Sequence, residues 1–340
     1  MVTFYMVNDN VHSSQPKGLT ETNSTQVTEA FAALANETRV EILLVLWSAM
    51  DPRPETDASE TLPSFVELYD RVKYDQTSNF QYHLEKLTGQ FVNKTDEGYR
   101  LTTSAKRVLS TVLAGTVTDA PSFAEERIDA ACMLCGTSTI VDYSDGVLTQ
   151  RCPSCDGVSQ EPNEPEGVIA KEYRPPVGLK NRTPQEFVQQ GKTWQRHQRH
   201  AFIEGACPEC SGTITTTISV CDDHDSHDLT VCQHCERVHE IDASFVCDVC
   251  KSSIRTGIWN TILTEVAVIA FFHDHGLDTK ALEDKFEYGV LFDAVEQVTV
   301  DAEEPLEIAV KVELDGDSLT IILDDEADVI DVTERVRKAP

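Results

Sequence analysis

Eleven cysteines carry the clearest chemical signal in this sequence of 340 residues. Ten of them form five Cys-x-x-Cys pairs, and the eleventh, Cys221, is followed three positions later by His224. A pair at this spacing allows one tight turn to present two sulfurs to a tetrahedral ion. Because such pairs in a reducing compartment bind metal more often than they form disulfides, the pattern predicts Zn²⁺ as the cofactor, as two to three structural ions.

Two of the pairs match the four-cysteine zinc pattern closely. Cys132 and Cys135 are separated by sixteen residues from Cys152 and Cys155, and the intervening segment reads as two strands around Ser-Asp-Gly. We therefore predict a zinc ribbon over residues 130–175, with a further strand after the second pair. Four thiolates complete the coordination of the ion, so the site is expected to be structural and not catalytic.

A second region, residues 207–257, contains eight potential ligands, which is the complement of two ions. The ligands form four pairs, namely Cys207 and Cys210, Cys221 and His224, Cys232 and Cys235, and Cys247 and Cys250. A nested arrangement joins the outer pairs around one ion and the inner pairs around another. A cross-braced arrangement joins alternate pairs, and a sequential one joins neighbours. A simpler alternative uses four cysteines and leaves the insert without metal.

The charge of the chain has two interpretations. The net charge is −30, with 58 acidic residues and 13 lysines, and an acidic surface ordinarily repels nucleic acid. The same composition is typical of proteins adapted to molar salt, where the Debye length falls to about 3 Å and bulk repulsion is largely screened. Residues 1–115 carry 10 basic and 15 acidic residues against 6 and 21 in residues 260–340, so the N-terminal part is the less acidic of the two.

Several classes of protein are not supported by the sequence. No apolar run approaches the roughly 20 residues of a membrane span, and we see no signal peptide, so we expect a cytoplasmic protein without membrane partners. We find no phosphate loop, GxGxxG, GxSxG or HExxH motif, and we expect no enzyme activity. His273 and His275 flank Asp274 but lack further ligands, and we interpret them as a helix end.

The N-terminal part predicts the elements that would present a binding surface. Residues 1–23 are expected to be a flexible tail, and residues 24–118 predict helices, a hairpin and a closing helix. Asn36 is expected to cap the second helix. In that helix an apolar face is predicted from the i, i+3, i+4, i+7 spacing of Val40, Leu43, Leu44 and Trp47.

One of these helices, around residues 77–88, has a clear apolar face and a clear polar face. Phe80, Leu84 and Leu87 fall on one side and are expected to face the core. The opposite side and the hairpin that follows carry side chains suited to bases and phosphates. The DNA-binding candidates are Thr77, Ser78, Asn79, Gln81, Tyr82, Lys86, Lys94 and Arg100.

These segments resemble the ArsR-type winged helix-turn-helix transcriptional regulators. NETRVEILLVL is similar to their second helix, and FQYHLEKLTGQFV followed by EGYRLT resembles their recognition helix and wing. The chain resembles the haloarchaeal branch of these regulators, whose members carry C-terminal zinc-ribbon modules. This further likeness lies in the cysteine pairs and in the segments RPPVGLKNRTPQEF and VAVIAFFHDHGLD. The resemblance implies regulation of transcription through double-stranded DNA bound as a homodimer.

The resemblance also favours the nested arrangement of the second metal region. In the resembled branch, the knuckle before the AVIAFFHDHG-like helix is the usual partner of the CPEC knuckle. Between Glu204 and Cys250, Arg237 is the one basic residue against ten acidic ones, so we assign this region to folding or protein contacts. Two alternatives stay open: a zinc-ribbon adaptor for a protein partner, and a metal-responsive sensor, since ArsR-type regulators often respond to metals.

The complete prediction is an α+β chain of several modules. It comprises the N-terminal winged helix-turn-helix, two zinc-ribbon-like β modules and a small C-terminal α+β unit. Residues 176–206 are expected to be a linker and a helix between the two zinc modules. Residues 258–340 predict a helix ending at Gly276, a hairpin around Asp315-Gly316-Asp317 and a last strand.

Overall fold

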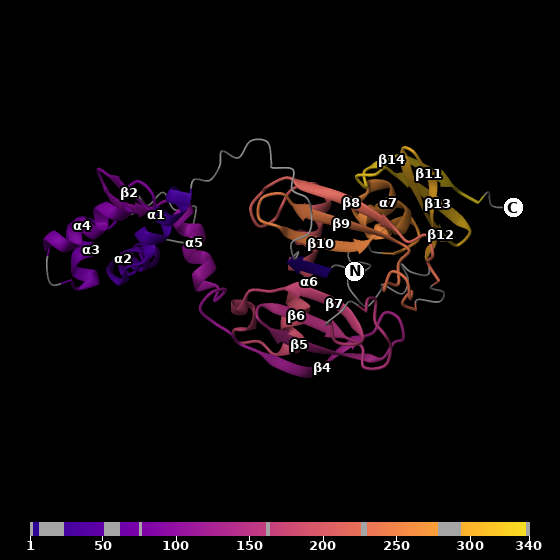
Figure 1. Ribbon diagram of the computed structural model, residues 1–340, viewed down its shortest axis with the longest axis horizontal. Helices are drawn as coiled ribbons and strands as arrows, with labels where there is room; N and C mark the ends of the chain where they lie inside the picture. Colours follow the sequence, from indigo (N-terminus) through magenta and orange to yellow (C-terminus); the bar gives the residue numbers. More distant parts are fainter. Residues whose placement is uncertain are drawn as a thin grey trace. The chain divides into compact units, whose positions relative to one another are not determined.

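A computed structural model of the chain describes residues 3–6, 24–50, 62–74, 77–160, 164–225, 230–277 and 294–337. The fold is mixed α+β, with helices and largely antiparallel sheets, as predicted (Figure 1). The chain divides into two compact units. The small unit is Gln15–Asp119, and the large unit combines Met1–Ser14 with Ala120–Pro340.

The small unit is a sequence of helices interrupted by a two-stranded sheet. In chain order its described elements are α1 (Ser24–Leu34), α2 (Glu37–Ser48), α3 (Phe65–Val72), α4 (Thr77–Leu87), β2 (Val92–Thr95), β3 (Gly98–Leu101) and α5 (Thr103–Leu113). Strands β2 and β3 form an antiparallel hairpin around Asp96 and Glu97. Residues 51–61, a polar segment with two prolines, lie outside the described residues.

Side-chain caps define the helix starts of the small unit. Asn36 Oδ1 accepts a hydrogen bond from the backbone N–H of Arg39 (3.2 Å), as predicted for the start of α2. Ser64 and Glu67 form a reciprocal capping box at the start of α3. Thr102 caps α5 by accepting a bond from the Ala105 N–H (3.1 Å). The Asn36 cap lies between Leu34, the last residue of α1, and Glu37, the first residue of α2, and so separates the two helices.

The core of the small unit confirms one predicted helix face and corrects another. In α4, Phe80, Leu84 and Leu87 are at most 2% exposed, as expected. In α2 the predicted face was right for Leu43, which is buried, but wrong for Val40 and Leu44, which are exposed. Ile42 and Leu46 are buried in their place. Apolar residues surround this helix on nearly all sides, so their periodicity could not identify the side that packs against α3 and α4.

The large unit contains an eight-stranded sheet, a four-stranded sheet and the helices packed on them. Its described elements are β1 (Thr3–Met6), β4 (Phe123–Ala131), β5 (Ser138–Ser144), β6 (Val147–Arg151), β7 (Val168–Tyr173), η1 (Pro176–Leu179), α6 (Pro184–Ile203), β8 (Ile214–Val220), β9 (Ile241–Cys247), β10 (Ser252–Gly257), η2 (Ile258–Thr264), α7 (Val266–Asp274), β11 (Val295–Glu303), β12 (Leu306–Leu314), β13 (Asp317–Leu323) and β14 (Val329–Arg335).

The two zinc modules predicted separately share one sheet. Its strand order is β4-β5-β6-β7-β1-β10-β9-β8, so β1 lies between the two modules. Thr3–Met6 pairs with Ser252–Arg255, and Thr3 also pairs with Lys171 in β7. The prediction of a tail over residues 1–23 is therefore wrong for this strand. A four-residue segment is too short to be distinguished from a tail by periodicity.

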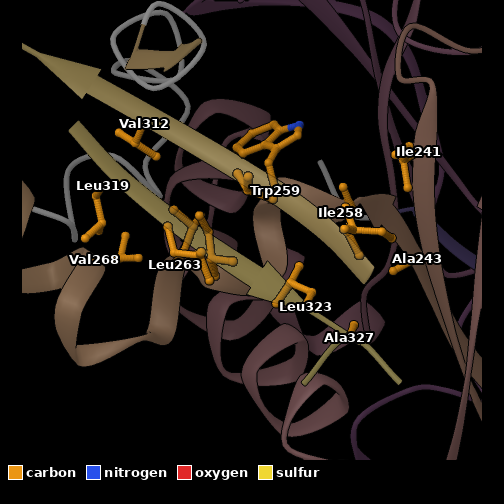
Figure 2. Packing of buried hydrophobic residues seen from close by; sticks show 14 of the residues in the cluster. Ile241, Ala243, Ile258, Trp259, Leu263, Val268, Val312, Leu319, Leu323 and Ala327 are labelled. Carbon is orange, nitrogen blue, oxygen red and sulfur yellow. The ribbon is translucent and has the colours of Figure 1, made fainter. Parts of the chain in front are cut away.

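The C-terminal sheet belongs to the large unit and is not a separate module. Its strands are ordered β11-β12-β13-β14, with the hairpin turn at Asp315 and Gly316 as predicted. One core joins β9, η2, α7, β12 and β13 (Figure 2). Figure 2 shows Ile241 and Ala243 on one side of this core and Val312 and Leu319 on the other. The predicted helix ends before Gly276, which has a positive φ of 76°, but η2 precedes it as a short 3₁₀ segment.

A buried ion pair lies beneath helix α6. Helix α6 is the helix predicted within residues 176–206. Thr183 caps it, Pro184 begins it, and it packs against β4, β9 and β10. Arg174 and Glu172, at the end of β7, form an ion pair in which both residues are at most 4% exposed. The guanidinium also donates to the Phe187 carbonyl (3.2 Å). Gly191 makes room for it, because a Cβ there would lie 0.9 Å from Arg174 Nη1.

We predict that Gly191→Ala destabilises the large unit by about 3 kcal/mol. The new methyl group displaces Arg174 and leaves the Glu172 carboxylate buried without its partner, which costs more than the roughly 1 kcal/mol gained in helix propensity. Denaturant unfolding of the metal-loaded chain measures the effect. Gln189→Ala, at an exposed position of the same helix, is the control and should be nearly neutral. Equal stability of the two variants would contradict the role assigned to Gly191.

Candidate metal centres and DNA-facing surface

Twelve predicted metal ligands come together in three groups of four. The groups are Cys132, Cys135, Cys152 and Cys155; Cys207, Cys210, Cys247 and Cys250; and Cys221, His224, Cys232 and Cys235. We call them clusters 1, 2 and 3. Within each cluster the ligand atoms all lie within 4.8 Å of one another. Clusters 2 and 3 have the composition that the nested arrangement predicts.

The spacing of the ligand atoms fits a tetrahedral metal ion. In cluster 1, Cys132 Sγ lies 3.6 Å from Cys155 Sγ, and in cluster 2 Cys207 Sγ lies 3.5 Å from Cys250 Sγ. A Zn–S distance of about 2.3 Å implies a sulfur separation of about 3.8 Å, whereas a disulfide requires about 2.05 Å. All eleven cysteines are free thiols. The clusters therefore fit metal ions, and four protein ligands in each leave no open position for a substrate.

Short backbone turns place the sulfurs. In three knuckles the first cysteine donates its N–H to the carbonyl five residues later, from Cys132 to Thr137 (2.7 Å), from Cys207 to Gly212 (2.9 Å) and from Cys232 to Arg237 (2.8 Å). Backbone N–H groups also point at the first sulfur, as from Leu134 to Cys132 Sγ (3.4 Å). The position after the second cysteine often has a positive φ, 75° at Gly136. The Cys-x-x-Cys spacing is what this turn requires.

Burial and hydrogen bonding act in opposite directions on the thiols. Burial raises the pKa of Cys132 to about 11, and burial likewise raises the pKa of Cys207 to about 12. Hydrogen bonds with Thr137, from its side chain first, lower the pKa of Cys135 to about 6. In the metal-free protein each cluster thus combines protonated and readily ionised ligands, and a cation is needed to hold four charged ones.

Two supporting residues were not predicted from the sequence. Thr137 Oγ1 lies 3.4 Å from Cys135 Sγ, and Ser252 Oγ lies 3.2 Å from Cys250 Sγ. Each hydroxyl follows the second cysteine of its knuckle by two positions, which is a signal that could have identified them. Hydrogen bonds from outside the coordination shell orient metal ligands and favour their charged form.

Cluster 3 is attached to the rest of the large unit by backbone and ionic contacts. The Val238 N–H donates to the Val158 carbonyl (3.2 Å), which joins the cluster 3 knuckle to the segment after cluster 1. Arg237 and Arg255 both approach Asp242 Oδ2, at 3.4 Å and 3.3 Å. The one basic residue between Glu204 and Cys250 is therefore held in an internal ion pair, which leaves this surface acidic.

All eight predicted DNA-facing residues are exposed and belong to the small unit. They are Thr77, Ser78, Asn79, Gln81, Tyr82 and Lys86 on α4, Lys94 on β2 and Arg100 on β3. Tyr82 is 52% exposed although its neighbours Phe80 and Leu84 are buried. The helix therefore presents a polar, partly aromatic surface opposite its core face.

Local contacts hold several of these side chains in place. Gln81 Nε2 donates to Glu85 Oε1 (2.8 Å), and Lys86 Nζ lies 5.6 Å from the centre of the Tyr82 ring. On the hairpin, Lys94 Nζ lies 5.9 Å from the Tyr99 ring. The cations are thus kept near the surface beside aromatic rings, where they are able to meet an anion without becoming buried.

Comparisons with known proteins identify families without a stated activity. A family model described as a domain of unknown function (DUF7351) matches residues 129–329. A second, described as a domain of unknown function (DUF7347), matches residues 27–112. No curated protein and no solved structure matches the chain. Within the described residues, no helix is both long enough and apolar enough to cross a membrane.

We predict that the purified chain binds three metal ions and that Cys232→Ser binds two. The substitution removes one ligand from cluster 3, while clusters 1 and 2 keep all of theirs. Elemental analysis after exhaustive dialysis measures the stoichiometry. Gln233→Ala, an exposed non-ligand in the same knuckle, is the control and should keep three ions. Loss of all metal from Cys232→Ser would contradict the independence of the clusters.

We also predict the release of at least two protons for each metal ion bound at pH 7. Burial raises the thiol pKa of two cysteines in every cluster: Cys132 and Cys155, Cys207 and Cys210, and Cys221 and Cys235. These thiols are protonated in the metal-free chain and must ionise on binding, so the metal affinity falls roughly a hundredfold per pH unit of acidification. Calorimetry in buffers of different ionisation enthalpy counts the protons. A count below one per ion would show that the thiols are already ionised.

Proposed function

Because the chain belongs to the family of the domain of unknown function DUF7351, whose description states no activity, we propose its function from its own surfaces. We propose a DNA-binding transcriptional regulator of the ArsR winged-helix type, with Zn²⁺ in three structural sites. The observation that carries the proposal is the set of eight exposed polar side chains on α4 and the β2–β3 hairpin.

The order of elements in the small unit supports this proposal. Helices α2 to α4 precede the hairpin and α5 follows it, which is the order of a winged helix-turn-helix. In this interpretation α4 is the recognition helix and the hairpin is the wing. The α4 side chains include Asn79 and Gln81, which are suited to adenine, and Lys86, which is suited to guanine or phosphate. Lys94 and Arg100 then contact the backbone of the duplex.

The charge distribution directs the proposed duplex to the small unit. Residues 204–250, which include all eight ligands of clusters 2 and 3, carry ten acidic residues and one basic residue, Arg237, which is engaged by Asp242. Phosphates are repelled there, whereas α4 and the hairpin offer Lys86, Lys94 and Arg100 at exposed positions. High salt supports binding by a chain of net charge −30, because screening removes the long-range repulsion and leaves the local contacts.

Structural zinc is the role we propose for the three clusters. Eleven thiolates and one imidazole are ligands that zinc prefers, and each cluster offers four of them. A closed tetrahedral ion stabilises the turns it joins and performs no reaction. The clusters thus maintain the large unit, while recognition belongs to the small one.

Homodimerisation through the small unit is part of the proposal. A near-palindromic operator requires two recognition helices related by a two-fold axis. Exposed apolar side chains on the outer helices suit such an interface: Phe31 on α1 is 71% exposed and Leu113 on α5 is 47% exposed. Val27 lies one helical turn from Phe31 and is 41% exposed, so α1 carries an apolar stripe.

We predict that chromatin immunoprecipitation from the native host, at its own salt concentration, enriches a defined operator. Gln81→Ala and Tyr82→Ala should each weaken binding to that operator by about 1–3 kcal/mol, because each removes a contact to bases. Lys94→Ala and Arg100→Ala should instead weaken binding to all sequences and each reduce the salt dependence by about one ion. Fluorescence anisotropy with a labelled operator measures both effects.

Gln189→Ala is the matched control for Gln81→Ala, because it is the same change at an exposed position of the large unit. It should leave operator binding unchanged. If no operator is enriched, or if the two glutamine variants behave alike, the recognition surface is not where we place it. A zinc-ribbon adaptor that binds another protein would then be the better interpretation.

A further inference from the structure

Strand β8 forms one edge of the eight-stranded sheet, and it differs from the other edge strands of the two large sheets. The opposite edge, β4, has two register irregularities and contains Glu125, Glu126, Arg127 and Asp129. Strands β11 and β14, at the edges of the C-terminal sheet, also have irregular registers and acidic residues. Bulges and charges of this kind are the usual protection of an edge against pairing with another strand.

Strand β8 has neither form of protection. Its sequence, Ile-Thr-Thr-Thr-Ile-Ser-Val, contains no charge and no proline, in a chain of net charge −30. All of its residues, Ile214 to Val220, pair with β9 without a register shift. Among the described residues, no strand lies on its other side (Figure 1). A regular, uncharged edge is a template for a further strand.

The hydrogen bonds to β9 identify the backbone groups that point outward. The Thr213 carbonyl accepts from Asp248 (3.1 Å), and the Cys221 N–H donates to Glu240 (3.0 Å). Because bonded and non-bonded positions alternate in an antiparallel ladder, the odd-numbered residues of β8 bond to β9. The N–H and C=O groups of Thr216, Ile218 and Val220 therefore face away from the sheet.

Both ends of this outward edge are defined by the metal centres. The cluster 2 knuckle precedes β8, and Ala206 forms a bridge with Thr213 that covers the beginning of the edge. Cys221 of cluster 3 directly follows Val220. The open stretch is thus residues 216–220, held extended between two metal sites, so little conformational entropy remains to be lost when another strand pairs with it.

We propose that this edge pairs with the same edge of a second copy of the chain, antiparallel and with the two-fold axis at Ile218. In that register Thr216 lies opposite Val220 of the second copy, and Ile218 lies opposite itself. The backbone N–H and C=O groups of Thr216, Ile218 and Val220 then all form hydrogen bonds across the axis. The two sheets become continuous through their edges.

The side chains of the edge are complementary in this register. On the exposed face, Thr217 meets Ser219 of the second copy, a hydroxyl pair of the kind that stabilises neighbouring strands. On the other face, Ile218, which packs against the large core, meets its own equivalent. The paired stretch carries no charged side chain, which suits self-pairing in an otherwise acidic chain. The pairing also includes every residue of the open stretch 216–220, because the chain of each copy leaves the strand beyond it.

A photo-crosslinking amino acid at Thr217 of the full chain tests the proposal directly. Thr217 is exposed and does not touch the metal ligands. Irradiation should give a covalent dimer whose crosslinked peptides both contain residues 213–220. The same amino acid at Glu126, on the protected edge β4, is the control and should give no dimer. A Thr217 crosslink to any other segment of the chain, or no dimer at the highest protein concentration that stays in solution, would overturn it.

Two substitutions at Thr216 separate strand pairing from general packing. Thr216→Pro removes an outward N–H while leaving the bonds to β9 in place, so it should reduce the crosslinked dimer at least tenfold. Thr216→Val keeps that N–H and the branched shape, and it should crosslink like the unsubstituted chain. An unchanged metal content shows that the proline variant is folded. Equal crosslinking of the two variants would overturn the proposal, as would crosslinking to a different protein in cell extract in place of the second copy.

The outcome is independent of the proposed DNA binding. The edge belongs to the large unit, and the recognition residues belong to the small one. Tyr82→Ala should leave the Thr217 crosslink unchanged, and Thr216→Pro should leave the contacts between α4 and a single half-site unchanged. Failure of one proposal is therefore distinguishable from failure of the other.

Discussion

Close packing of sulfur atoms is the constraint on which the large unit depends. In cluster 2, Cys210 and Cys247 hold their sulfurs 3.5 Å apart, too far for a disulfide and too close for two unscreened thiolates. A bound cation resolves this conflict, because it replaces repulsion by four attractive bonds. Three such clusters join segments that are distant in the sequence, such as Cys207 and Cys250. By joining these segments, the clusters stabilise the turns and the sheet to which the turns belong.

The two units achieve stability by different means. The small unit has one apolar core built from α2, α3, α4, the hairpin and α5, and none of the three clusters lies in it. The large unit combines an extensive apolar core with three clusters of metal-ligand residues and the buried Glu172–Arg174 pair. Loss of metal therefore acts directly on the large unit, which contains all twelve ligands. The proposed DNA-recognition residues and the metal ligands thus belong to different units.

Local signals were sufficient for the ligands and for most elements, and they failed where tertiary packing decides. The Cys-x-x-Cys spacing, the Asn36 cap and the 80–87 helix face depend on a few neighbouring residues, so they could be predicted. The nested pairing needed more than spacing, since four arrangements satisfy the same pattern. The buried side of α2 and the strand at Thr3–Met6 depend on partners elsewhere in the chain. The charged strand β4 lacks the alternation that identifies a strand.

The position of β1 has a consequence for the order in which the chain folds. Thr3 of this strand pairs with Arg255, which lies about 250 residues later in the sequence. At about 5–20 residues per second, its partner leaves the ribosome roughly 10–50 s later. The small unit, with its local contacts, is complete long before that. The eight-stranded sheet is therefore completed late in synthesis. Strand β1 remains without its partner β10 while the small unit, which follows it in the sequence, is synthesised and folds.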